Sequence, residues 1–118
     1  MKALSIRQPY ANEILTGQKK IELRTWSTSW RGDLLISSSA KPDAGTNGGM
    51  YPLGAAICIV KLMDVRPMRR KDCKALDTDI LWLDGICWIL ADVRPVQPIG
   101  IKGKLRLFEV DDRMIRRI

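Results

Sequence analysis

Hydrophobic and polar residues alternate along several short stretches of the chain, as they do in half-buried β-strands. In residues 3–7, Leu4 and Ile6 fall on one face, whereas Ser5 and Arg7 fall on the other. The run 55–63 is almost wholly apolar and rich in β-branched residues, which predicts a central strand. By the same reasoning, further strands are predicted at residues 20–26, 34–38, 87–93 and 105–110.

Helical spacing follows the first of these strands. Pro9 is well placed to open a helix, Ala11, Ile14 and Leu15 form its apolar stripe, and Gly17 is placed to end it. A second short helix is expected within residues 72–83, and the Pro- and Gly-rich segment 41–54 predicts a long loop. These elements together predict an α+β fold, a small mixed β-barrel of five to six strands with one to three short helices.

Composition narrows the chemistry that such a domain could perform. The 118 residues suit one domain over 1–118, and their +7 charge with a pI near 9.7 favours an anionic partner. There is no histidine, and three scattered cysteines are too few for a disulfide framework or a zinc site. We therefore expect no metal and no cofactor. No apolar run approaches the roughly 20 residues of a membrane span, so a cytoplasmic location is expected.

The polar face of the strand at 20–26 is unusual. Lys20, Glu22, Arg24 and Trp26 project together from it, and Lys19 precedes it at the turn. One interpretation is an ordinary solvated strand with alternating charge. The other is a nucleotide site, because arginine and lysine neutralise phosphate and a carboxylate accepts hydrogen bonds from exocyclic amines. On that second interpretation, an alternative role for Glu22 is only to orient the cations beside it.

Other residues favour the second interpretation. Arg7 lies on the polar face of the first strand, and Ser38 and Lys41 lie where a strand gives way to a loop. Trp26 and Trp30 offer flat surfaces on which a base could stack, worth roughly 1–3 kcal/mol per stacked base.

A family resemblance is carried by these same segments. Gly17, Lys19, Glu22 and Arg24 match the pattern G-x-K-x-x-E-x-R, which here follows the run Arg-Gln-Pro-Tyr at 7–10. With the closing segment 98–108, the sequence resembles the ASCH family, which is related to the PUA RNA-binding domains. The resemblance implies a PUA-like β-barrel with short helices flanking a cleft, and the lysine, glutamate and arginine of the motif lining that cleft.

The resemblance also bears on function. ASCH proteins are generally proposed to bind RNA or modified nucleosides; some small bacterial members remove the acetyl group of N4-acetylcytidine, and nuclease activity is ascribed to others. In the amidohydrolases a threonine stands where this chain has Glu22, and a later glutamate completes the set. This chain has no glutamate between Glu22 and Glu109. It therefore departs from the amidohydrolase pattern at two places.

Two functions from different classes stay open, with a protein-interaction module as a third. The first is an RNA- or modified-nucleotide-binding domain, acting as a monomer or in an oligomer, with a monomer favoured. The alternative is an amidohydrolase or ribonuclease that needs no metal, with Lys19 and Glu22 as candidate catalytic residues. Ligand contacts are expected from Arg7, Tyr10, Lys19, Glu22, Arg24, Trp26, Trp30, Ser38 and Lys41.

Overall fold

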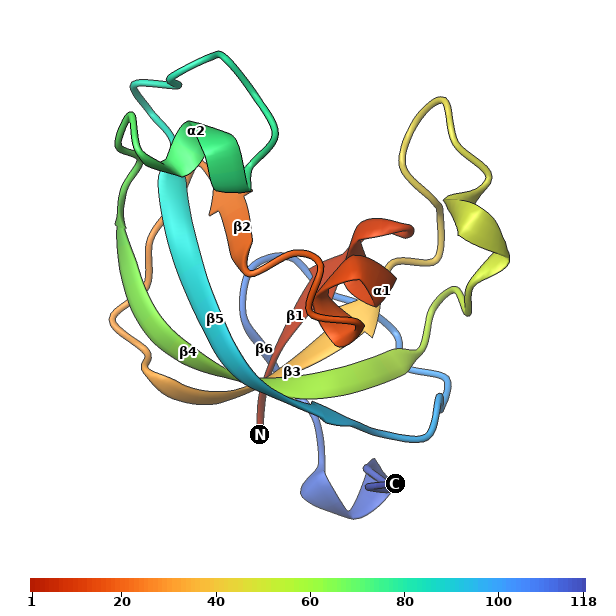
Figure 1. Cartoon of the computed structure of the whole chain (residues 1–118). Helices are drawn as coiled ribbons and strands as arrows, with labels where there is room; N and C mark the ends of the chain where they lie inside the picture. Colours follow the sequence, from red (N-terminus) through yellow and green to blue (C-terminus); the bar gives the residue numbers. More distant parts are fainter.

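Six β-strands form one strongly curled mixed sheet (Figure 1), in a computed structural model that describes residues 1–118. The strand order is β2-β5-β4-β3-β1-β6; β1 and β3 run parallel, and all other neighbours are antiparallel. Because the edge strands β2 and β6 do not pair with each other, the sheet is a half-barrel. The strands are β1 (Lys2–Ile6), β2 (Ile21–Arg24), β3 (Gly32–Ser38), β4 (Ala56–Pro67), β5 (Ile86–Pro95) and β6 (Phe108–Glu109).

Both faces of the central strands are buried. On β3, Leu34 and Ile36 belong to the larger core cluster, whereas Leu35 between them belongs to a second cluster on the opposite face. The same alternation divides β4, where Val60 faces the larger cluster and Ile59 faces the smaller one. A strand covered on two sides needs apolar residues at every position. This explains why the sequence at 55–63 shows a continuous apolar run rather than an alternating one.

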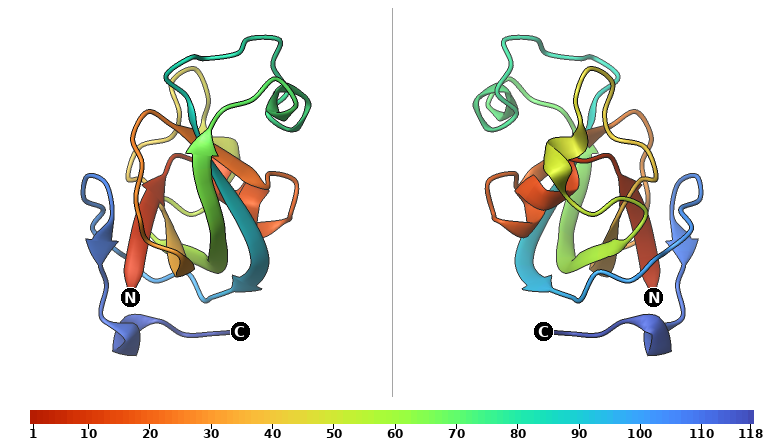
Figure 2. Two further views of the ribbon diagram at one scale, coloured as in Figure 1. Left: turned by 90° about the vertical axis from the view of Figure 1, so that its left-hand side faces the viewer. Right: turned by 90° about the vertical axis from the view of Figure 1, so that its right-hand side faces the viewer.

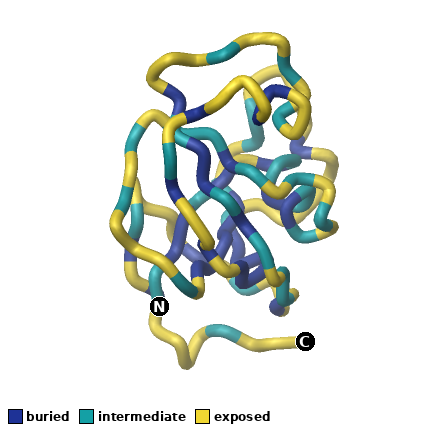
Figure 3. Tube along the Cα trace, turned by 60° about the vertical axis from the view of Figure 1, so that its left-hand side comes forward, coloured by how far each residue is buried: buried dark blue, intermediate teal, exposed yellow.

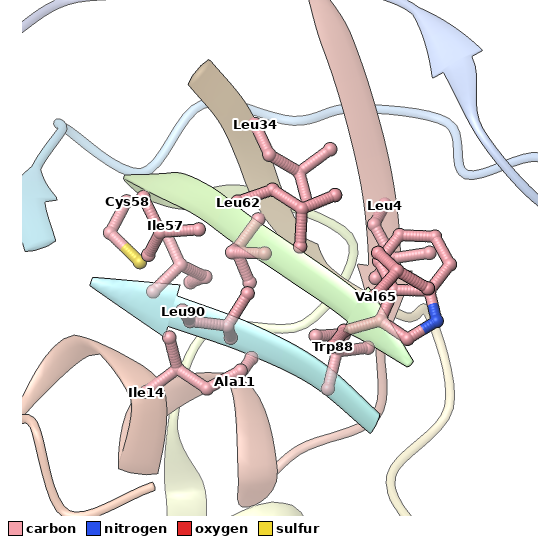
Figure 4. Close-up of a cluster of buried hydrophobic side chains, with 13 residues drawn as sticks. Leu4, Ala11, Ile14, Leu34, Ile57, Cys58, Leu62, Val65, Trp88 and Leu90 are labelled. Carbon is pink, nitrogen blue, oxygen red and sulfur yellow. The ribbon is translucent and has the colours of Figure 1, made fainter. Parts of the chain in front are cut away.

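Helix α1 (Tyr10–Leu15) covers the concave side of the half-barrel. Its buried residues Ala11 and Ile14 point toward Leu90 on β5 and complete the larger core (Figure 4). Gly17 follows with a φ of +80°, a left-handed conformation that glycine adopts without strain, and the chain turns there into β2. The predicted helix and its glycine stop are therefore confirmed.

Helix α2 (Asp72–Ala75) is a single turn in the connection between β4 and β5. The Asp72 carboxylate is 3% exposed and pairs with Arg66 of β4 through two bonds of 2.7 and 2.8 Å. It also accepts the backbone N–H of Arg69 at 2.8 Å. The hydrogen-bonded Arg66 guanidinium holds the pKa of Asp72 well below its usual range. This buried pair fastens the connection to the sheet.

The structure differs from the sequence-based expectation in the length of the last strand. The last strand is only Phe108–Glu109, because Leu105 is 94% exposed and Arg106 has a φ of +57°, which breaks the strand geometry. The second helix lies within the predicted range 72–83, at Asp72–Ala75, and residues 76–85 form a loop. Short 3-10 turns at Gly48–Met50 and Asp112–Met114 complete the elements.

The two long loops, one between β3 and β4 and the other between α2 and β5, lie at one end of the half-barrel. Both chain termini lie at the other end (Figures 1 and 2). Burial follows this arrangement, with buried residues concentrated in the middle of the strands and exposed ones in the loops (Figure 3). The predicted α+β fold with six strands and short helices is confirmed, in the form of an open half-barrel. No helix combines the length and the apolar character needed to cross a membrane.

Candidate functional site

A cleft of about 360 Å³ opens between the end of β1, the start of α1, strand β2 and the segment that precedes β6. Its volume lies at the lower end of the range of roughly 300–1,000 Å³ that is typical of small-ligand sites. Its walls combine uncharged polar and apolar residues with charged side chains. The lining consists of Leu4, Ser5, Ile6, Arg7, Tyr10, Glu22, Leu23, Arg24, Ser39, Asp43, Lys104, Leu105 and Arg106.

Glu22 is at the centre of the charged wall. It is 7% exposed and lies between two cations, with Lys19 Nζ 3.5 Å from one carboxylate oxygen and Arg24 Nη2 2.8 Å from the other. Arg24 Nη2 also donates to the backbone carbonyl of Ser5 at 3.0 Å, which ties β2 to β1 across the cleft. Arg24 Nε is buried and donates to no protein atom. Glu22 therefore orients both cations of the sequence motif.

Tyr10 forms the next part of the wall, at the first residue of α1. Its hydroxyl donates to the Asp43 carboxylate at 3.0 Å, and the Lys19 ammonium lies 5.5 Å from its ring centroid. The bond to Asp43 raises the pKa of the Tyr10 phenol, since ionisation would place two negative charges together. Asp43 thus brings the long loop after β3 into the site.

The segment before β6 supplies the wall that faces β1. Gly103 lies so close to Ser5 that a Cβ at this position would be 2.9 Å from the Ser5 hydroxyl oxygen. On the same segment, the Arg106 guanidinium lies over the ring of Trp26 at 5.1 Å. Trp26 in turn meets the buried Trp88 edge to face, with ring centroids 4.8 Å apart. The stacking face that Trp26 presents toward this segment is therefore covered by Arg106.

Positive charge predominates in the cleft. Four basic side chains line it, Arg7, Arg24, Lys104 and Arg106, against the two carboxylates Glu22 and Asp43. Only Arg24 is paired with a carboxylate, whereas Arg7, Lys104 and Arg106 form no ion pair. No group of three or more metal-ligating side chains comes together anywhere in the chain.

The predicted site residues are only partly brought together. Arg7, Tyr10, Glu22 and Arg24 line the cleft; Lys19 contacts Tyr10 and Glu22 but borders a neighbouring hollow rather than the cleft itself. The remaining four lie outside the lining: Trp26, Trp30, Ser38 and Lys41.

Each of these four has its own environment. Trp26 lies beneath Arg106, which lines the cleft in its place. Lys41 is exposed on the loop after β3. Trp30 packs beside Lys2 on a different face and donates its indole N–H to the backbone carbonyl of Asp33. Ser38 is buried, and its hydroxyl bonds the backbone of Ala55 at 3.1 and 3.3 Å, which is a structural role.

Three charged residues of the cleft were not expected from the sequence: Asp43, Lys104 and Arg106. Arg106 falls in a stretch that alternates like a strand, so its pattern predicts a sheet residue. A sequence signal exists for Lys104 and Arg106. Both lie close to Gly103, in a segment that ends at the buried apolar residue Phe108.

The curled half-barrel with a short helix across its concave side is a PUA-like fold. The ASCH domain model matches residues 4–100, and the chain belongs to this family. The crystal structure of the ASCH protein from Zymomonas mobilis is similar, with a TM-score of 0.65 at 14% identity, covering 96% of this chain and 89% of that one. A tyrosine-to-phenylalanine variant of the same protein gives a TM-score of 0.66 at 13% identity, covering 96% and 91%. A search of curated proteins found no match.

Proposed function

We propose that this ASCH domain binds RNA or a modified nucleotide in the cleft between β1, β2 and the segment 103–106. The observation that carries the proposal is the convergence of Arg7, Lys104 and Arg106 on one cleft without carboxylate partners. Cations that line one cleft repel one another in the free protein, and a bound polyanion offsets that repulsion because it attracts each of them. A nucleic acid is such a polyanion.

The arrangement of the motif residues supports a recognition role. Glu22 is almost completely buried, and the interpretation of β2 as an ordinary solvated strand does not explain such a buried carboxylate. Its two oxygens hold Lys19 and Arg24 in fixed places, and the Ser5 carbonyl fixes Arg24 from the other side. Preordered cations lose little side-chain entropy when a ligand binds.

Binding of a short fluorescent single-stranded RNA, followed by fluorescence anisotropy, tests the proposal. Arg24→Ala should weaken binding roughly 10-fold or more, because it removes a charged hydrogen-bond donor from the cleft. Arg116→Ala is the matched control, since Arg116 is an exposed arginine outside the cleft. Equal effects of the two substitutions would reduce the interaction to nonspecific charge and contradict the proposal.

Hydrolysis of a modified nucleoside or of RNA is a second candidate, and one contact favours it. The Lys19 ammonium lies 3.5 Å from Glu22 at the edge of the cleft, and an ammonium beside a carboxylate is a pair that acid–base catalysis can use. Against it, both Glu22 oxygens are already occupied by cations, which suits a positioning role better than proton abstraction.

Incubation of the protein with N4-acetylcytidine and with single-stranded RNA, followed by chromatography, separates the two candidates. Turnover that Lys19→Ala abolishes and Lys20→Ala leaves intact would establish the hydrolase, since Lys20 is the exposed neighbour of Lys19. No turnover at high protein concentration, together with cleft-dependent RNA binding, would leave the binding function alone.

A further inference from the structure

The segment between Ile101 and Phe108 is built as a wall of the cleft. Both of these apolar residues are buried, at 8% and 7% exposure, whereas residues 102–106 between them are exposed. Gly103 allows the segment to lie against β1, because any larger residue would bring its Cβ to 2.9 Å from the Ser5 hydroxyl oxygen. The segment is therefore fixed at both ends and lies close to β1 in the middle, and its side chains Lys104 and Arg106 line the cleft.

The two cations of this wall that line the cleft have no carboxylate partner within the protein. Lys104 and Arg106 form no ion pair, and the Arg106 guanidinium lies over the ring of Trp26, which orders the guanidinium without neutralising it. Arg7 lines the same cleft from β1 and is also unpaired. Three cations from two walls thus face one cavity whose volume, about 360 Å³, suits a ligand of nucleotide size.

We propose that the site recognises a phosphate group, so that its ligand is a phosphorylated nucleotide rather than a neutral nucleoside. Resting on the nucleotide-binding function proposed above, this assigns the phosphate to Lys104 and Arg106 on one wall and Arg7 on the other. Arginine presents a planar set of donors that matches phosphate oxygens, and lysine adds a point charge. The phosphate belongs either to a free nucleotide or to one residue of an RNA strand.

Isothermal titration calorimetry with matched ligands tests the phosphate directly. Each of the four ribonucleosides is compared with its 5′- and 3′-monophosphate at one fixed ionic strength. For at least one base, a monophosphate should bind wild-type protein roughly 10- to 100-fold more tightly than its nucleoside, as expected for charged hydrogen bonds. Equal affinities for every nucleoside and its monophosphates would overturn the proposal.

A pair of double variants locates the effect. Lys104→Gln/Arg106→Gln should reduce the phosphate preference to less than about threefold, because it leaves only Arg7 among the unpaired cations. Lys102→Gln/Arg116→Gln removes the same charge from exposed positions outside the cleft and should leave the preference unchanged. All four positions are exposed, so both proteins should fold, which a thermal melt verifies. A preference that survives in the first double variant would also overturn the proposal.

Short RNA strands with a 5′-hydroxyl or a 5′-phosphate separate the two sources of phosphate. Tight binding of monophosphates alone identifies a free nucleotide as the ligand, whereas tighter binding of strands identifies a phosphate within RNA. In either case the Lys104→Gln/Arg106→Gln protein must lose affinity. RNA binding that depends on Arg24 but ignores this double substitution would leave the binding function intact and refute the phosphate assignment.

Discussion

Two aspartate–arginine pairs of this protein have the same contact distance but very different burial, and they offer a test of what fixes the segment around α2. Asp72 pairs with Arg66 at 2.7 Å, and Asp33 pairs with Arg94 at 2.7 Å. The Asp72 side chain is 3% exposed, whereas that of Asp33 is 48% exposed. We predict that Asp72→Asn destabilises the protein much more than Asp33→Asn.

The magnitude follows from the surroundings of each carboxylate. In Asp72→Asn the amide places donors against Arg66 and the N–H of Arg69, and leaves the Arg66 charge without a partner, for a cost of about 3–5 kcal/mol. Solvent screens the exposed Asp33 pair, so its loss should cost no more than about 1 kcal/mol.

Urea unfolding followed by tryptophan fluorescence measures both variants. With an m-value on the order of 1.5 kcal/mol per molar urea, Asp72→Asn should lower the midpoint by about 2–3 M, and Asp33→Asn by less than about 0.7 M. Similar shifts for the two variants would refute the reasoning, because burial would then not decide the strength of the pair.

The pH dependence gives a second readout of Asp72. Its pKa is lowered in the folded protein by the Arg66 bond, so its stabilisation is complete at neutral pH. That contribution is lost as the pH falls below the unfolded value of about 4 toward the lower folded value. Acid should therefore reduce the stability of wild type more steeply than that of Asp72→Asn, and parallel curves would contradict this assignment.

Three further predictions concern the cleft and the core. If three unpaired cations each contact a phosphate of single-stranded RNA, the logarithm of affinity should fall with the logarithm of salt at a slope of about −2, and Arg7→Gln should reduce this to about −1.4; an unchanged slope would exclude Arg7. Ser38→Ala should cost about 1–3 kcal/mol in urea unfolding, because it leaves the buried Ala55 N–H unpaired, and should not alter RNA affinity. Burial raises the pKa of Cys58 to about 12 and that of Cys87 to about 11, so iodoacetamide at pH 8 should label them only after unfolding; mass spectrometry of the native protein would reveal any faster reaction.

Periodicity in the sequence was sufficient for most of the fold. The apolar run at 55–63 predicted the central strand β4, and the spacing of Ala11 and Ile14 with Gly17 beyond predicted α1. These patterns are local consequences of burial, because a residue on a covered face must be apolar whatever surrounds it. The prediction of a strand over 105–110 was wrong for residues 105–107. The sequence alternates there, but no neighbouring strand pairs with Leu105 and Arg106.

The charged face at 20–24 illustrates what the sequence determined about the site. Alternation placed Glu22 and Arg24 on one side of a strand, and the family motif predicted that this side lines a cleft. Whether Glu22 is solvated or buried depends on what lies opposite, and that is fixed by β5 and the residues of β1. Burial of a carboxylate between two cations is a property of the assembled sheet.

The sequence by itself determined the α+β class, every strand except the extent of the last, the first helix, the basic character and the motif of Lys19, Glu22 and Arg24. The tertiary structure decided which charges share a site: it brought Lys104 and Arg106 to the same cleft as Arg7 and placed Trp30 and Ser38 elsewhere. The physical reason is that electrostatic contact depends on distance through space, and residues almost 100 positions apart in the chain come together only when the sheet curls.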